Sequence, residues 1–206
     1  MSFIGFMKEV FKHLVIFVAL VIAFSSLSAC TSTETTQNAD ASNANSVAEK
    51  PSSDFPLVPS ALAQADIDLI DGTKTKVSDR KGKVLLLNLW GIWCIPCISE
   101  MPHLVKMQDK YREQGFQIIG LNVGDEDAQP EDINKIKEFA AKQGLNYELA
   151  RLSDSFAVDF NKITKFEGVP QTILIDRGGH LRGVFKGAAP DVVKSMEENV
   201  EKVVNE

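Results

Sequence analysis

Apolar residues gather in two short, almost uninterrupted runs in the middle of the chain. The runs read KVLLLNLW at residues 83–90 and FQIIGLNV at residues 116–123. A strand that is covered on both faces carries apolar side chains at nearly every position, whereas a half-exposed strand alternates apolar and polar ones. Both runs are therefore predicted to be central strands of a buried sheet.

Helical spacing of apolar residues follows each of these strands and returns near the end of the chain. Gly115 and Gly144 supply stops for the first two helices, and a short strand is predicted near residues 147–150. The helices are predicted over residues 96–114, 133–144, 155–161 and 191–203.

Two pairs of short strands have turn signals between them. Asp71-Gly72 separates predicted strands near residues 64–69 and 74–77, and Gly178-Gly179 separates the segments QTILID and LRGVFKG. Strands that alternate with helices form βαβ units, and the hairpins add antiparallel strands. The sequence therefore predicts an α/β fold with a mixed central sheet and helices on both faces.

The first 30 residues have the pattern of an export signal. Lys8 and Lys12 precede an apolar run from Leu14 to Phe24, which is shorter than the about 20 residues of a membrane span. Small residues then lead to Cys30 in the sequence LSAC, which resembles the bacterial lipobox. We expect residues 1–29 to be a lipoprotein signal peptide and Cys30 to carry acyl chains that hold the protein at a lipid membrane. The alternative is a plain signal anchor with an incidental cysteine.

Residues 30–58 are predicted to be the acylated cysteine and a flexible tether, and residues 59–206 a single domain. From residue 31 to about residue 54 the chain is mainly Thr, Ser, Asn, Ala and Gln, so it cannot bury enough apolar surface to offset its ordering entropy. The formal net charge of −6 and the lack of a basic stripe argue against nucleic acid as a partner. We expect the domain in the cell envelope, outside the cytoplasm, and on the periplasmic side in a Gram-negative cell.

The segment WCIPC contains Cys94 and Cys97, the two cysteines of the predicted domain. Such a pair can be half of a zinc site, a structural disulfide or a redox-active dithiol. A structural zinc site usually needs about four thiolate or imidazole ligands, and the domain offers only His103 and His180 beyond the cysteines. A purely structural disulfide would close a very short loop and give little entropic stabilisation.

The placement of the pair favours a redox-active dithiol. It follows the strand at residues 83–90 and begins the helix at residues 96–114, where unpaired backbone N–H groups and the helix dipole favour an anion. Such a position lowers the pKa of a cysteine and supplies the thiolate that performs disulfide exchange.

Three sequence features in two separate segments resemble the thioredoxin superfamily. WCIPC is similar to its active-site motif, LLLNLWGIWCIPCISEMP resembles the membrane-tethered TlpA/ResA-like branch, and GVPQT precedes a strand where the family carries a cis-proline. The resemblance covers nearly all of residues 60–204. It implies a thioredoxin fold with an N-terminal β-hairpin extension and a central α-β insertion between about residues 131 and 150.

The resemblance implies a role for each residue of the motif. Cys94, at the exposed end, would be the attacking thiolate, and Cys97 would resolve the mixed disulfide, so that the pair cycles through a Cys94–Cys97 disulfide. Ile95 and Pro96 would set the redox poise, although Pro96 also suits simple helix initiation. Trp93 would shield the thiols and offer apolar surface to a substrate, or else be ordinary core.

The family's cis-proline would be Pro170, which would place the backbone of Val169 next to the dithiol. There the backbone could pair with a substrate chain in the manner of a strand.

Asn88 marks a departure from ordinary thioredoxin, which has a buried aspartate at this position. An amide cannot take a proton from the resolving cysteine, so Glu100, one helical turn after Cys97, is expected to do so. Its charge would then raise the pKa of both cysteines. The alternative is that Glu100 is a surface carboxylate.

The resulting hypothesis is an exported, lipid-anchored protein thiol-disulfide oxidoreductase without a cofactor. From the resemblance we expect it to act as a reductant of protein disulfides such as those of apocytochrome c, with electrons from a membrane thiol reductase. Two other functions stay open: a copper-binding chaperone that uses the cysteines with His180, and a thiol peroxidase.

Overall fold

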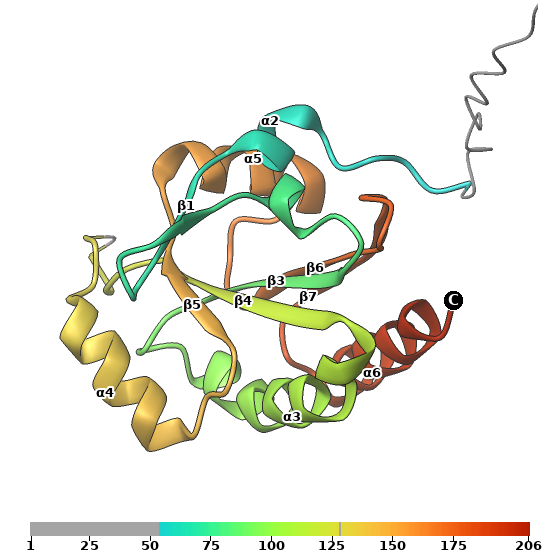
Figure 1. Ribbon diagram of the computed structural model, residues 1–206. Helices are drawn as coiled ribbons and strands as arrows, with labels where there is room; N and C mark the ends of the chain where they lie inside the picture. The colour runs from blue at the N-terminus through green and yellow to red at the C-terminus, as the bar shows by residue number, and fades with distance from the viewer. Residues whose placement is uncertain (1–53, 128) are drawn as a thin grey trace, which may run out of the picture. The chain divides into compact units, whose positions relative to one another are not determined.

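The computed structural model of the chain describes residues 54–127 and 129–206 (Figure 1). Within them, seven strands form one sheet in the order β2-β1-β5-β4-β3-β6-β7. The strands are β1 (Ile67–Leu69), β2 (Lys74–Thr75), β3 (Val84–Trp90), β4 (Phe116–Asn122), β5 (Glu148–Arg151), β6 (Gln171–Ile175) and β7 (Leu181–Lys186). The helices are α2 (Ser60–Gln64), α3 (Ile95–Tyr111), α4 (Ile133–Gln143), α5 (Asp154–Thr164) and α6 (Pro190–Val204), with 3-10 turns η1 (Val77–Arg80) and η2 (Arg112–Gln114).

The two apolar runs form the centre of the sheet. β3 lies parallel to β4, with Val84 opposite Phe116, and antiparallel to β6, with Leu89 opposite Gln171. β4 is also parallel to β5, whereas β6 and β7 form the antiparallel hairpin that was expected around Gly178-Gly179. The mixed sheet predicted from the sequence is therefore confirmed.

Helices cover both faces of this sheet (Figure 1). The odd-numbered residues Leu85, Leu87 and Leu89 of β3 pack in one core cluster with residues of α2 and α5. The even-numbered residues point to the other face, where the side chains of α3, α4 and α6 meet the sheet. Because both faces of β3 are covered, all seven of its residues are buried. The thioredoxin-like α/β architecture thus follows from its strand pattern.

The beginning of the domain differs from the sequence prediction. Residues 60–64 form α2, although a strand was expected from about residue 64, and β1 begins only at Ile67. The three central residues of SALAQ are apolar, its Ala and Leu residues favour a helix, and Leu62 is fully buried in the core. The second predicted strand is also shorter, because η1 begins at Val77. The hairpin itself is present, with Ile67 opposite Thr75.

The folded domain includes residues that were assigned to the tether. The backbone N–H of Val58 donates to the Gly179 carbonyl at 2.9 Å, and that of Leu181 donates to the Pro56 carbonyl at 2.8 Å. Residues 56–58 therefore pair with the turn between β6 and β7, upstream of the expected boundary at residue 59. The predicted signal peptide, Cys30 and most of the tether lie outside the described residues. Within residues 54–127 and 129–206 no helix is both long and apolar enough to cross a membrane.

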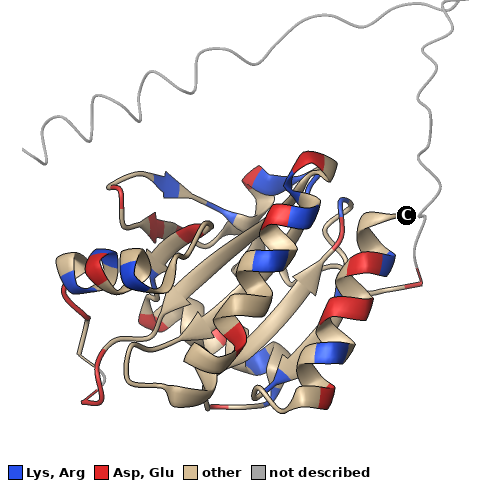
Figure 2. Ribbon diagram, turned by 90° about the horizontal axis from the view of Figure 1, so that it is seen from below, with Lys and Arg blue, Asp and Glu red and all other residues tan. Residues whose placement is uncertain are grey.

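Charged residues lie on the outer parts of the domain. In Figure 2 basic and acidic positions alternate along the helices, while the strands at the centre are largely uncharged. No continuous basic face is visible in this view, which agrees with the net charge of −6.

Candidate active site

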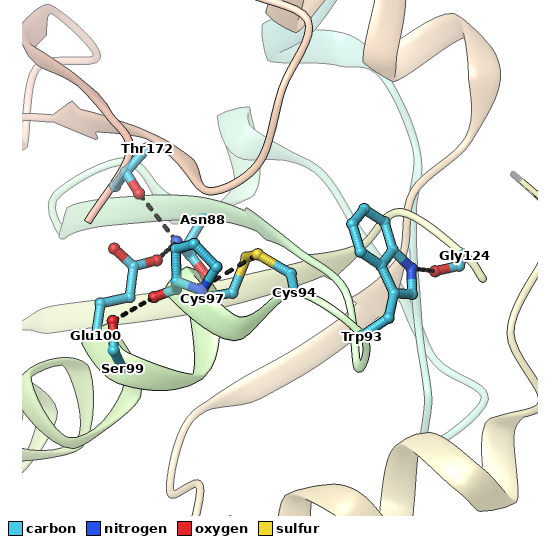
Figure 3. The surroundings of a disulfide bond; sticks show 9 residues. Asn88, Trp93, Cys94, Cys97, Ser99, Glu100, Gly124 and Thr172 are labelled. Atoms are coloured by element: carbon cyan, nitrogen blue, oxygen red, sulfur yellow. Dashed lines mark hydrogen bonds between the residues drawn. A yellow bond between two sulfur atoms is a disulfide. The ribbon is translucent and has the colours of Figure 1, made fainter. Parts of the chain in front are cut away.

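The two cysteines form a disulfide where β3 ends and α3 begins (Figure 3). Their sulfur atoms are bonded, with Cα atoms 5.2 Å apart. The Cys94 sulfur caps the helix by accepting a hydrogen bond from the backbone N–H of Cys97, with 3.2 Å between nitrogen and sulfur. Pro96 occupies the first turn, where no N–H is required. The sequence thus places the sulfur pair at the N-terminal end of α3, where the helix dipole stabilises an anion.

Both cysteines are buried in the disulfide form. Only 3% of Cys94 is exposed and none of Cys97, so the expectation of an exposed Cys94 is wrong for this oxidised state. Cys94 remains the outer of the two, because it precedes the helix whereas Cys97 lies within its first turn. The exposed surface next to the disulfide is instead provided by Ile95, which is 79% exposed, and by Pro96.

Trp93 offers apolar surface but does not shield the sulfur atoms. Its indole N–H donates to the Gly124 carbonyl at 2.9 Å, and in Figure 3 the ring points away from the disulfide. A Cβ atom at Gly91 would lie only 2.8 Å from this ring, so a glycine there allows the ring to pack against the backbone. With 39% of its surface exposed, Trp93 can contact a partner.

The Val169-Pro170 peptide bond is cis, as the resemblance implied. Pro170 is buried and precedes β6, whose first residue pairs with Leu89 at the end of β3 that leads into the disulfide. Val169 packs against the core cluster that contains Cys94 and Cys97. Among the described residues, the backbone of Val169 has no backbone hydrogen-bond partner, so it can pair with another chain.

Glu100 is buried on the inner side of α3, with only 2% of its surface exposed. The alternative that Glu100 is a surface carboxylate is therefore wrong. The Asn88 side-chain amide donates to Glu100 Oε1 at 2.7 Å and to the Thr172 hydroxyl oxygen at 2.9 Å (Figure 3). Burial raises the pKa of Glu100 to about 7, although the hydrogen bond from Asn88 lowers it. A carboxyl group with this pKa can exchange protons near neutral pH.

Thr172 was not anticipated as a member of the site. It lies in the segment GVPQT that identified Pro170, and only the pairing of β3 with β6 brings it opposite Asn88. The Asn88 amide thereby joins the helix that carries the cysteines to the strand that follows Pro170.

A groove of about 390 Å³ lies beside the disulfide and includes Trp93 and Val169. Its floor contains apolar residues such as Leu89 and Leu152. Among the residues that the structure describes, Asp125, Glu126, Asp154 and Glu167 are its acidic lining residues, and no lysine or arginine lines it.

The two histidines within the described residues do not lie next to the cysteines. His103 is on the exposed side of α3, where its Nδ1 lies 2.9 Å from Glu197 Oε1. His180 lies in the turn between β6 and β7, at the end of the sheet opposite the disulfide, and its ring is hydrogen-bonded to the Asp176 carboxylate. A copper site formed by Cys94, Cys97 and His180 is therefore wrong for this geometry.

The fold, the helix-capping cysteine pair and the cis-proline beside it define a thioredoxin-superfamily protein with a redox-active disulfide. Its activity is that of a protein thiol-disulfide oxidoreductase. The chain belongs to the Redoxin family, whose model matches residues 58–204. The TlpA/ResA-like resemblance of the sequence is confirmed by its relatives.

Two of these relatives carry the name thiol-disulfide oxidoreductase ResA. The protein from Bacillus thuringiensis subsp. konkukian is 34% identical over 138 residues, which cover 65% of this chain and 71% of the relative. The protein from Bacillus anthracis is 38% identical over 114 residues, or 53% of this chain and 58% of the relative.

Solved structures share the fold. A thiol:disulfide interchange protein from Chlorobium tepidum has a TM-score of 0.60 at 24% identity and covers 74% of this chain and 98% of its own. A thiol-disulfide isomerase from Corynebacterium glutamicum has a TM-score of 0.56 at 22% identity, with coverage of 74% and 98%.

Proposed function

We propose that the protein is an exported, lipid-anchored reductant of protein disulfides, in which Glu100 handles the proton of the resolving cysteine. The observation that carries this proposal is the buried Glu100 carboxyl, one helical turn after Cys97 and bonded to Asn88. No observation on the described residues favours a thiol peroxidase.

The reaction begins with the reduced dithiol. The Cys94 thiolate attacks a substrate disulfide, a bond forms between Cys94 and one substrate sulfur, and the other substrate sulfur leaves as a thiolate. Ionised Glu100 then takes the proton of the Cys97 thiol. The Cys97 thiolate attacks the Cys94 sulfur, which releases the second substrate sulfur and leaves the Cys94–Cys97 disulfide. Two electrons have passed to the substrate, and the substrate thiolates take protons from solvent.

The position of Glu100 also supports the reducing direction. A dithiol protein is a strong oxidant when its reduced form is stabilised, chiefly by stabilisation of the thiolate. An ionised carboxylate close to the cysteines does the opposite, because like charges repel in a buried site. A disulfide in this setting should be harder to reduce, and the corresponding dithiol should be the better electron donor.

The surface around the disulfide suits a polypeptide substrate. The free backbone of Val169 can pair with an extended substrate segment, while Trp93, Ile95 and Pro96 provide apolar contact area. The rest of that segment can lie in the adjoining groove, whose carboxylates favour basic side chains.

The cellular setting is part of the same proposal. The lipobox-like LSAC segment supports acylation of Cys30 and a location on a membrane outside the cytoplasm. Apocytochrome c as substrate and a membrane thiol reductase as electron donor are proposed because the sequence resembles the membrane-tethered TlpA/ResA-like branch. Metabolic labelling with a fatty-acid analogue tests the anchor, because a Cys30→Ser variant should lose the label.

The reduction potential is the decisive test of direction. The purified domain is equilibrated with defined ratios of reduced and oxidised dithiothreitol or glutathione, and the fraction of disulfide is measured. We expect a potential well below the about −120 mV of a strong oxidant. A value near −120 mV would overturn the reductant proposal. Insulin reduction by wild type and Cys94→Ser tests the oxidoreductase activity itself, since equal rates would show that Cys94 is not the attacking residue.

A further inference from the structure

Three buried polar groups near Glu100 have no hydrogen-bond partner among the described residues. They are the Asn88 side-chain oxygen, the Trp90 indole N–H and the Tyr147 hydroxyl. Buried polar groups in native proteins are almost always paired, either with other protein groups or with ordered water. Several such groups in one place therefore indicate a site for a polar ligand.

The three groups meet on the α3 side of the sheet. Asn88 and Trp90 are two residues apart on β3, so their side chains point to the same face, and Asn88 lies opposite Gly120 of β4. A Cβ atom at Gly120 would lie 3.0 Å from Trp90 Nε1 and 3.2 Å from Tyr147 Cε2. The absence of a side chain at Gly120 thus lets both the indole and the phenol ring pack close to the strand at this point.

Glu100 belongs to the same cluster. It accepts the hydrogen bond from Asn88. Burial, with a smaller contribution from the charge of Glu100, raises the pKa of Tyr147 well above the usual range. The Tyr147 hydroxyl is therefore neutral at physiological pH. The groups that face Glu100 from the packed elements are Asn88 of β3, Thr172 of β6 and Tyr147, which precedes β5.

Tyr147 also lies between this cluster and the outside. Its side chain lines a surface pocket of about 300 Å³ together with residues of β1, α4 and β5, while its hydroxyl oxygen is buried. Glu100 has little direct access to solvent, because only 2% of its surface is exposed. A proton on Glu100 thus needs a route, and Tyr147 lies where such a route would reach the surface pocket.

We infer that Glu100, Asn88, Trp90 and Tyr147 line an internal water-binding site, through which the proton taken from Cys97 passes from Glu100 to solvent past Tyr147. This inference rests on the proposed role of Glu100 in the resolution step.

The chemistry of the four groups is complementary to water. The indole N–H can only donate, the Asn88 oxygen can only accept, and the Tyr147 hydroxyl can do both. A water molecule can therefore accept from Trp90 and donate to Asn88 or to ionised Glu100. When protonated Glu100 gives its proton to this water, the water passes one of its own protons onward, and a proton reaches bulk solvent. No bond to sulfur changes, and nothing is oxidised or reduced.

The water site can be tested in the oxidised, ¹⁵N-labelled protein by nuclear magnetic resonance. The chain has two tryptophans, so the indole N–H signals are readily separated, and Trp93, bonded to Gly124, is an internal reference. We expect a cross-peak between the Trp90 indole proton and a long-lived water, with opposite signs in NOESY and ROESY spectra. The absence of that cross-peak would overturn the water site.

The proton route is tested with Tyr147→Phe, which keeps the ring and removes only the hydroxyl. The matched control is Tyr111→Phe, a buried tyrosine at the other end of α3. We expect resolution of a mixed disulfide at neutral pH to slow by about tenfold in Tyr147→Phe, less than the 10²–10⁴-fold of losing an acid–base group, with a changed solvent deuterium isotope effect. Equal rates and isotope effects in wild type and Tyr147→Phe would overturn the route.

A Glu100→Gln variant separates this inference from the proposed function. Glutamine keeps a polar group beside Asn88 but cannot take a proton. If this variant retains the Trp90 water signal and resolves at the wild-type rate, the proposed role of Glu100 and the proton route through it both fail, while the water site stands. Slow resolution in Glu100→Gln with a wild-type rate in Tyr147→Phe rejects the route and keeps the role of Glu100.

Discussion

The buried Glu100 carboxyl makes the stability of the oxidised protein depend on pH. Its pKa is about 7 in the folded protein against 4.5 for an ordinary glutamate. Below about pH 4 the Glu100 carboxyl is protonated in both the folded and the unfolded protein, so its contribution to stability is fully present. As the pH rises through the folded-state pKa, folding must be achieved with an ionised, buried carboxylate, and that stability is lost. At about 1.4 kcal/mol per unit of pKa displacement, the loss amounts to about 3 kcal/mol by pH 8 to 9.

Glu100→Gln removes this dependence and retains an acceptor for the Asn88 amide. We expect the free energy of unfolding of Glu100→Gln, relative to wild type, to rise by about 3 kcal/mol between about pH 4 and pH 9. The measurement is urea denaturation of the oxidised proteins across this range, where no thiol titrates. The control is Glu113→Gln at an exposed position of η2, for which the difference from wild type should stay constant. A constant difference for Glu100→Gln as well would refute the argument that burial raises its pKa.

Three further substitutions test neighbouring features. Asn88→Asp replaces the amide nitrogen that lies 2.7 Å from Glu100 Oε1 by a second carboxyl, so the two carboxyl groups should share one proton. The fall in the free energy of unfolding should then move above about pH 7, and an unshifted pH profile would contradict this. Gly120→Ala places a Cβ atom 2.9 Å from a leucine methyl and 3.0 Å from an indole nitrogen, and should destabilise the fold by about 1–3 kcal/mol in urea titrations. Trp93→Phe removes the bond to Gly124 and should cost about 0.5–1.5 kcal/mol, with faster amide hydrogen exchange in the loop that follows; exchange at the wild-type rate would show that the bond does not restrain the loop.

The centre of the fold was predictable because its strands have an unambiguous pattern. β3 and β4 are buried on both faces, so apolar residues occupy nearly every position and a helix of that composition would have no solvent face. The first residues of the domain were less clear. The five-residue segment SALAQ is too short for its pattern to distinguish a helix from a strand, and the packing of Leu62 into the core favours α2.

The candidate site was predictable where a motif fixes its geometry. Cys94 and Cys97 lie where the resemblance placed them, because the end of β3 and the start of α3 are adjacent along the chain. Pro170 also lies where the resemblance placed it, but the pairing of β6 with β3 brings it there. The burial of Cys94 was not predictable, since it depends on how the chain around the disulfide packs. The partners of Glu100 were equally hidden, because Thr172 and Tyr147 approach it only through the pairing of distant strands.

The attachment of residues 56–58 to the turn between β6 and β7 fixes the end of the domain at which the preceding chain leaves it. That turn adjoins the start of β3, and the disulfide follows its end, about 20 Å further along for a seven-residue strand. A bead, a surface or a fused protein joined through the chain before Pro56 would therefore be attached next to the turn between β6 and β7. The disulfide would lie at the opposite end of the domain, away from the point of attachment and accessible to large substrates. Immobilisation through the N-terminus should therefore preserve the rate of insulin reduction.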